Sequence, residues 1–192
     1  MELAFVQGGL ATLADTDRLM TLGSLFFESL WIFHSDRNDP QRLGDLKGLR
    51  IAVGAEGSGT KALAQELLTI KAVTNQNSTL LLLDSQDAAN KLMKDEIDVA
   101  CFIGNPRSKT IMSLLRSNSV KLLGINRADA YAMQYKYLRV LNLAEGVIDI
   151  VRNIPPQDQA LVAPSGQLLT RSDLHSARHF PSAIDHSGLP TF

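Results

Sequence analysis

Short apolar runs alternate with amphipathic segments through the middle of the chain. Residues 51–53 form a β-branched apolar run that ends at Gly54, as expected of a strand buried on both faces. Residues 60–68 then carry leucines at helical spacing without Pro or Gly. This order repeats along the chain, so an α/β fold with right-handed crossovers and a parallel sheet is predicted. Further strands are expected at residues 80–83, 97–103 and 120–125, and further helices at residues 86–94, 108–116 and 128–137.

The N-terminal part has a different pattern. Residues 2–7 read as a buried strand that ends at Gln7 before two glycines, and residues 19–35 as two consecutive strands or one broken strand. Glu28 interrupts this second segment among aromatic residues that include Phe27. Because a buried carboxylate needs a partner, we expect Glu28 either to pair with a cation such as Arg50 or to reach a cleft.

Two polar turns are candidate hinges between domains. Residues 36–42 are rich in loop-forming residues, and residues 152–158 contain two consecutive prolines. The segment 159–164 reads as a strand that leads away from the second turn. From residue 175 onward neither strand nor helix periodicity is visible, so an irregular tail is expected over residues 175–192.

Composition narrows the function. The 192 residues are 45% hydrophobic and carry 19 basic against 20 acidic side chains, so neither nucleic acid nor an anionic membrane surface is favoured as a partner. No apolar run approaches the roughly 20 residues of a membrane span, and the first residues carry no basic leader. Cys101 is the single cysteine, and His175 and His179 lie in a Ser- and Pro-containing stretch unlike a helical metal site. We therefore expect no metal and no cofactor.

The turn at residues 57–60 carries the clearest chemistry. Gly57, Ser58, Gly59 and Thr60 place small residues and hydroxyls at a helix start, where free backbone N–H groups attract anions. The order Thr60-Lys61 does not match the nucleoside-triphosphate loop, and the glycine spacing does not match the dinucleotide fingerprint. A small carboxylate is the expected guest. The alternative is a helix capped by Ser58 or Thr60 without any ligand.

Several loops follow the carboxyl ends of predicted strands, where open α/β sheets bind ligands. Residues 57–60, Gln86 and Asn105 are expected to share one crevice, and Gln7 is expected at the same edge or as an ordinary strand end. No serine, cysteine, carboxylate-pair or metal-based catalytic set is visible among them. The pattern favours a binding module over an enzyme.

Several segments together resemble the TAXI family, the solute-binding proteins of tripartite ATP-independent periplasmic (TRAP) transporters. The similarity runs in order from about residue 2 to residue 174. The segments that carry it are AFVQG (4–8), LGSLFFE (22–28), LKGLRIAVG (46–54), EGSGT (56–60) and NIPP (153–156).

The resemblance implies a two-lobed fold like that of type II periplasmic binding proteins, with mixed or parallel sheets and flanking helices. Residues 1–35 with 151–174 would form the first lobe, and residues 36–150 the second. The family has a signal sequence and a first strand and helix ahead of Glu2, so we expect this chain to be a fragment with an incomplete first lobe. Its exposed sheet edge could then pair with a second copy.

The implied function is capture of a small carboxylate, such as glutamate, glutamine or a dicarboxylate, and its delivery to transporter subunits in the periplasm. The rival functions are the ligand-sensing domain of a regulator and a precursor-processing enzyme on the same fold. The predicted ligand contacts come from both lobes. They are Gln7, Phe27, Glu28, Gly57, Ser58, Gly59, Thr60, Gln86 and Asn105.

Overall fold

A five-stranded mixed sheet forms the larger part of the structure, a computed structural model that describes residues 3–9 and 19–172. The strand order is β5-β4-β6-β3-β7. Strand β4 runs parallel to β5 and β6, whereas β3 runs antiparallel to both β6 and β7. The predicted α/β class is therefore confirmed. The strands are β3 (Ser29–Ser35), β4 (Arg50–Ala52), β5 (Thr79–Leu81), β6 (Val99–Gly104) and β7 (Val120–Leu122).

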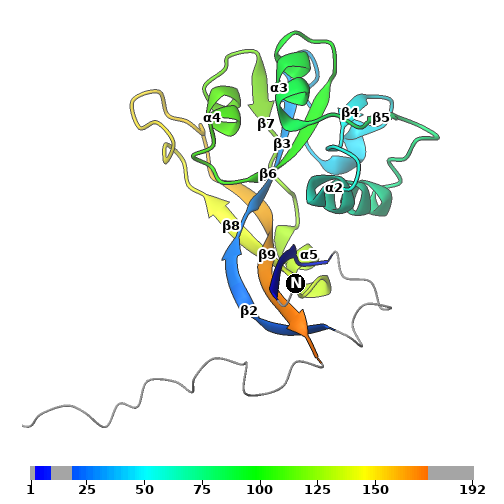
Figure 1. The fold of residues 1–192 in the computed structure, drawn as a ribbon. Coiled ribbons are helices and arrows are strands. Elements are labelled where there is room, and N and C mark those ends of the chain that lie inside the picture. The colour runs from blue at the N-terminus through cyan, green and yellow to red at the C-terminus, as the bar shows by residue number, and fades with distance from the viewer. Residues whose placement is uncertain (1–2, 10–18, 173–192) are drawn as a thin grey trace, which may run out of the picture.

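Helices cover both faces of this sheet (Figure 1). Buried residues of α2 and α5 join one core cluster, and those of α3 and α4 join the other. Three of these helices have side-chain caps, since Ser58, Asp84 and Ser108 accept backbone N–H groups at the starts of α2, α3 and α4. The bounds are η1 (Leu43–Leu46), α2 (Gly59–Ile70), α3 (Ser85–Met93), α4 (Lys109–Leu115) and α5 (Ala128–Gln134).

Strand β3 shows why the sheet is apolar on both sides. All seven of its residues are buried. Leu30 and Ile32 belong to the core cluster under α2, while Trp31 and Phe33 belong to the cluster under α3 and α4. Successive side chains of a strand point to opposite faces, so a continuous apolar run requires cover on both.

The second sheet is antiparallel and is organised around β9 (Gln159–Arg171), which is longer than predicted. Its first half pairs with β8 (Leu138–Leu143), and its second half lies between β1 (Leu3–Gln7) and β2 (Leu19–Phe27). The first strand is present, but the expectation that it is buried is wrong, because Phe5 is 69% exposed. This sheet exposes several large apolar residues, and pairing with a second copy remains a prediction.

Sheet membership corrects the predicted lobe boundaries. We placed residues 1–35 in the first lobe, but β3 pairs with β6 and β7 in the five-stranded sheet. The chain passes between the sheets at Glu28, and the polar turn at residues 36–42 links β3 to η1 instead. Likewise, β8 pairs with β9 although we placed it in the second lobe. The division into two lobes, residues 1–35 with 151–174 and residues 36–150, remains a prediction, and the strand pairing of β3 and β8 does not follow its boundaries.

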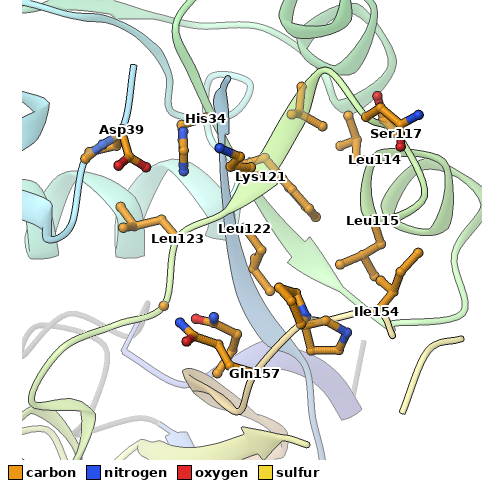
Figure 2. Close-up of a pocket in the computed structure, with 18 of the residues that line it drawn as sticks. His34, Asp39, Leu114, Leu115, Ser117, Lys121, Leu122, Leu123, Ile154 and Gln157 are labelled. Atoms are coloured by element: carbon orange, nitrogen blue, oxygen red, sulfur yellow. The ribbon is translucent and has the colours of Figure 1, made fainter. Parts of the chain in front are cut away.

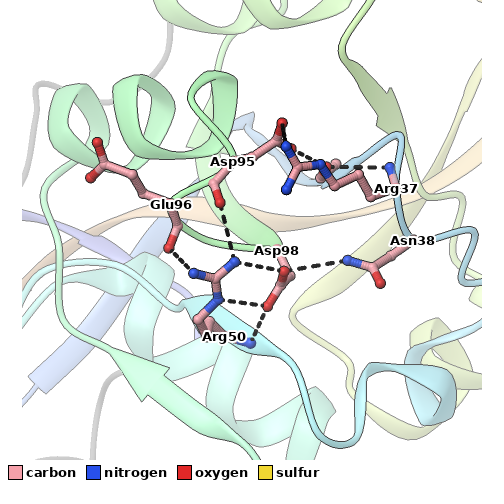
Figure 3. Close-up of polar contacts among 7 residues, drawn as sticks. Arg37, Asn38, Arg50, Asp95, Glu96 and Asp98 are labelled. Carbon is pink, nitrogen blue, oxygen red and sulfur yellow. Dashed lines mark hydrogen bonds and ion pairs between the residues drawn. The ribbon is translucent and has the colours of Figure 1, made fainter.

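Arg50 pairs with Asp98 and not with Glu28 (Figure 3). Its Nε and Nη2 atoms lie 3.0 and 2.9 Å from the two Asp98 carboxylate oxygens, and its backbone N–H also donates to Asp98. Two further guanidinium bonds go to the carbonyls of Asp95 and Glu96. The expectation of a Glu28–Arg50 pair is wrong, because β4 and β6 are neighbours and bring Asp98 beside Arg50.

The ion pair between Arg50 and Asp98 predicts that the fold becomes less stable in acid. Hydrogen bonds from Arg50 lower the pKa of Asp98, so the carboxylate stabilises the fold above the unfolded-state value of about 3.9 and stops doing so as pH falls through the lower folded-state pKa. Asp98→Asn should cost about 1–2 kcal/mol at neutral pH, because the pair is bidentate but partly exposed. In thermal unfolding, the gap between wild type and Asp98→Asn should narrow as the pH is lowered from about 6 toward 3. The exposed Asp129→Asn serves as control, and a gap that does not change with pH would contradict the assignment.

Candidate functional site

The first element of the site is the turn between β4 and α2. Gly54 has φ +106, a conformation that side chains other than glycine rarely adopt. Ser58 Oγ accepts from Lys61 N at 3.1 Å and donates to the Ala55 carbonyl at 2.7 Å. The Ser58 hydroxyl therefore caps the helix, as one of the two sequence interpretations expected.

Thr60 has a different structural role from the cap that we considered. Its Oγ1 accepts the backbone N–H of Ile103 at 3.2 Å. This bond ties the first turn of α2 to the C-terminal end of β6. The hydroxyl proton of Thr60 remains able to donate to a further acceptor.

The start of α2 retains donors for an anion. In the described part of the chain, no acceptor contacts the backbone N–H groups of Gly59 and Thr60. These are the first two residues of a 12-residue helix, whose N-terminal end carries partial positive charge. The arrangement can accept one carboxylate oxygen or a similar anion.

Gln7 approaches this helix start from the other sheet. Its Nε2 donates to the Gly59 carbonyl at 3.2 Å, across 52 residues of sequence. A Cβ atom at Gly59 would lie 2.0 Å from the Gln7 Oε1 atom, so only glycine permits this approach without moving Gln7. Gln7 and the helix start are thus brought together, as predicted.

A small cavity of about 120 Å³ opens beside Gln7. Glu28 lines it, which matches the expectation that this carboxylate reaches a cleft. Phe27, which we predicted as a contact, is absent from the lining, whereas its neighbour Phe26 is present, although both rings are partly exposed. Strand alternation puts these two rings on opposite faces, and the sequence alone does not say which face is the inner one. The lining residues are Phe5, Val6, Gln7, Phe26, Glu28, Ile103, Pro164 and Gly166.

Gln86 and Asn105 are outside this lining. The Gln86 side chain donates to Asn90 Oδ1 at 3.2 Å within α3. Asn105 Oδ1 accepts from Arg107 N at 2.8 Å in the turn before α4. Both amides therefore make local bonds within their own segments, and their predicted ligand roles remain predictions.

A larger cavity, of about 630 Å³, lies elsewhere, beside β7 and the loop at residues 152–157 (Figure 2). His34 lines it although the side chain is only 3% exposed, and His34 Nδ1 lies 3.0 Å from the Ser35 carbonyl. Lys121 also lines it and pairs with Asp36. No local pattern in the sequence indicates this cavity, because it is assembled from segments far apart in the chain.

The described residues do not form a catalytic set that we can recognise. Cys101 is buried in β6, and burial raises the pKa of its thiol to about 12, so it stays protonated and unreactive at neutral pH. No group of three or more potential metal ligands occurs among residues 3–9 and 19–172. His175 and His179 fall outside the described residues. The helices described here are too short or too polar to span a membrane.

The fold is similar to that of periplasmic binding proteins. A putative sulfonate-binding protein SsuA from Methylobacillus flagellatus KT matches with TM-score 0.57 and 14% identity over 90% of this chain and 43% of its own. The aliphatic sulphonate binding protein SsuA of Escherichia coli matches with TM-score 0.52 and 13% identity, over 86% of this chain and 47% of its own. AF1704 from Archaeoglobus fulgidus matches with TM-score 0.52 and 15% identity, over 92% of this chain and 52% of its own.

These solved structures show the fold that the chain shares, and the chain spans about half of their length. The chain belongs to the NMT1-like family, whose pattern matches residues 7–161. The matched region includes Gln7, the turn at residues 57–60 and the whole five-stranded sheet. The expected fold is thus the one that these solved structures share, and the finer TAXI assignment stays a prediction.

Proposed function

We propose that this chain is part of a periplasmic solute-binding protein that captures a small organic acid and delivers it to a membrane transporter of the TRAP type. The observation that carries the proposal is the start of α2, where the free N–H groups of Gly59 and Thr60 lie beside Gln7 from the other sheet. An anion held there would contact both sheets. Its binding would therefore stabilise the contact between Gln7 and the start of α2.

The charges near the site favour an amino acid among the small carboxylates. The helix start supplies donors for one carboxylate, and Glu28 places a negative charge at the adjoining cavity. A ligand with both a carboxylate and an ammonium group satisfies both features. A ligand whose ammonium group faces Glu28 would be attracted to it, whereas a second carboxylate close to Glu28 would be repelled. Glutamine and glutamate are therefore better candidates than a C4-dicarboxylate.

Isothermal titration calorimetry can test this proposal. The 192-residue chain should be titrated with glutamine, glutamate, succinate and an alkanesulfonate, the last because two matched structures are sulfonate-binding proteins. Tighter binding of an amino acid than of succinate or the sulfonate is expected. Failure to bind any of the four, in a chain that unfolds cooperatively, would refute the small-acid proposal.

A matched pair of glutamine variants tests the role of Gln7. One amide hydrogen of Gln7 bonds the Gly59 carbonyl and the other can donate to the ligand, so Gln7→Ala should weaken binding of the tightest ligand about two- to tenfold through the loss of one neutral hydrogen bond to the ligand. Gln167→Ala changes the same residue type in β9, where the side chain contacts Ser165, and should leave affinity unchanged. Equal calorimetric affinities for the two variants would remove Gln7 from the site.

A further inference from the structure

A basic cavity lies at the opposite end of α2 from the proposed ligand site. It has a volume of about 620 Å³, which is within the range of small-molecule sites. A 12-residue helix is about 18 Å long, so the two sites are well separated. The cavity is built from η1, the C-terminal end of α2 and the start of α5. Its lining residues are Arg42, Leu43, Gly44, Lys71, Asn126, Arg127 and Tyr131.

The lining is unbalanced in charge. It contains three cations and no carboxylate. Arg42 pairs with Asp45 through Nε at 3.0 Å, but Lys71 and Arg127 have no ion pair among the residues that the structure describes. The Lys71 ammonium lies 5.4 Å from the centre of the Tyr131 ring. Two cations at one cavity without a counter-charge would bind an anion favourably.

Arg127 is placed where the local structure gives no reason for a cation. It precedes α5 with φ 62 and forms no side-chain cap. The start of a helix disfavours positive charge, and an arginine in a left-handed conformation is strained. Lys71, by contrast, follows the C-terminal end of α2, where a cation is favourable for the helix itself.

Tyr131 supplies a second, independent observation. The residue is only 5% exposed, and its hydroxyl is a buried polar atom without a hydrogen-bond partner in the described part of the chain. An unpaired buried hydroxyl is unfavourable. The oxygen itself is covered in the unliganded chain, so a ligand that accepted this hydroxyl would first have to displace the atoms that cover it, and the new hydrogen bond would then remove the penalty.

We propose that this cavity binds the phosphate group of a small phosphorylated compound or of a phospholipid. Guanidinium and ammonium groups are the side chains that bind phosphate oxygens most strongly. The Tyr131 hydroxyl can add a neutral donor, and so can the second amide hydrogen of Asn126, whose Nδ2 also donates to the Gln41 carbonyl at 2.8 Å. The site is separate from the organic-acid site, and loss of one would leave the other intact.

Titration with sodium pyrophosphate at constant ionic strength tests the proposal. Lys71→Gln and Arg127→Asn should each weaken binding about tenfold or more, since each removes a charged donor. Asn is chosen because it tolerates the left-handed backbone of Arg127. Lys109→Gln removes an exposed charge from α4 and should leave affinity unchanged. Absence of pyrophosphate binding to the wild type, or an equal loss in all three variants, would overturn the proposal.

Tyr131→Phe provides a readout that a merely structural role would not reproduce. The variant removes only the unpaired hydroxyl, so the unfolding midpoint without ligand should not fall, while affinity for pyrophosphate should fall. A lowered midpoint with unchanged affinity would contradict a ligand role for Tyr131.

Cosedimentation with phosphatidylcholine vesicles, with and without phosphatidic acid, distinguishes a phospholipid from a soluble phosphorylated compound as the source of the phosphate group. Binding to the acidic vesicles that pyrophosphate displaces identifies a lipid headgroup, and no cosedimentation identifies a soluble phosphate compound.

Discussion

Gly54→Ala is expected to destabilise the protein by about 2–5 kcal/mol, because the new methyl group is both strained and overpacked. The backbone at Gly54 has φ +106, and a Cβ there would lie 2.9 Å from Ser58 Oγ and 3.0 Å from Lys61 N. Those two atoms form the cap of α2, so the substitution disturbs the helix start as well as the turn. The thermal unfolding midpoint should fall by roughly 5–15 °C for a chain of this size.

Gly44→Ala is the matched control for this effect. A Cβ atom at Gly44 would meet nothing within 4 Å, and its backbone is not left-handed. Replacing it should therefore change stability little, or raise it by up to about 1 kcal/mol through the unfolded state. If Gly54→Ala unfolded at the same temperature as Gly44→Ala, the turn would not have the geometry described here.

Thr60→Val is expected to lower both stability and ligand affinity. Valine has nearly the same shape, but it leaves the Ile103 N–H without the acceptor that lies 3.2 Å away, which costs about 1–3 kcal/mol. Ser58 cannot compensate, because its hydroxyl already bonds Ala55 and Lys61. The substitution therefore affects the fold as well as the proposed ligand contact.

Thr60→Ser separates the two roles of this hydroxyl. Serine keeps the oxygen and should retain the bond to Ile103, so its unfolding midpoint should stay close to that of wild type. Affinity for the amino acid identified by calorimetry should fall in Thr60→Val and remain near wild type in Thr60→Ser. A midpoint that falls in Thr60→Val while affinity stays the same would make Thr60 a structural tie between α2 and β6 only.

Local sequence patterns correctly predicted the strand, the glycine turn and the helix that frame the anion-binding end of the site. The apolar run at residues 51–53, the glycine turn and the helix after it are all present, and Asp84 and Ser108 begin α3 and α4 as their capping preference indicates. These features depend on neighbours within a few residues. Backbone conformation and capping are decided at that range, so the sequence is sufficient to predict them.

Pairing between distant segments was predicted less well. The run at residues 29–35 reads as a buried strand wherever it is placed, and only its register with β6 assigns it to the five-stranded sheet. The partner of Arg50 was wrong for the same reason, since Asp98 is 48 residues away and reaches it through the neighbouring strand. Periodicity reports which face of a strand is apolar but not which strand lies beside it.

The sequence by itself determined the α/β class, the order of most elements and the helix start that can receive an anion. The tertiary structure decided which side chains share that site, placing Gln7 beside Gly59 and leaving Gln86 and Asn105 in local bonds. It alone brought Lys71 and Arg127 to one cavity with Tyr131. Local elements form from interactions between near neighbours, whereas a binding site depends on how those elements pack, and many arrangements of packing are compatible with the same local pattern.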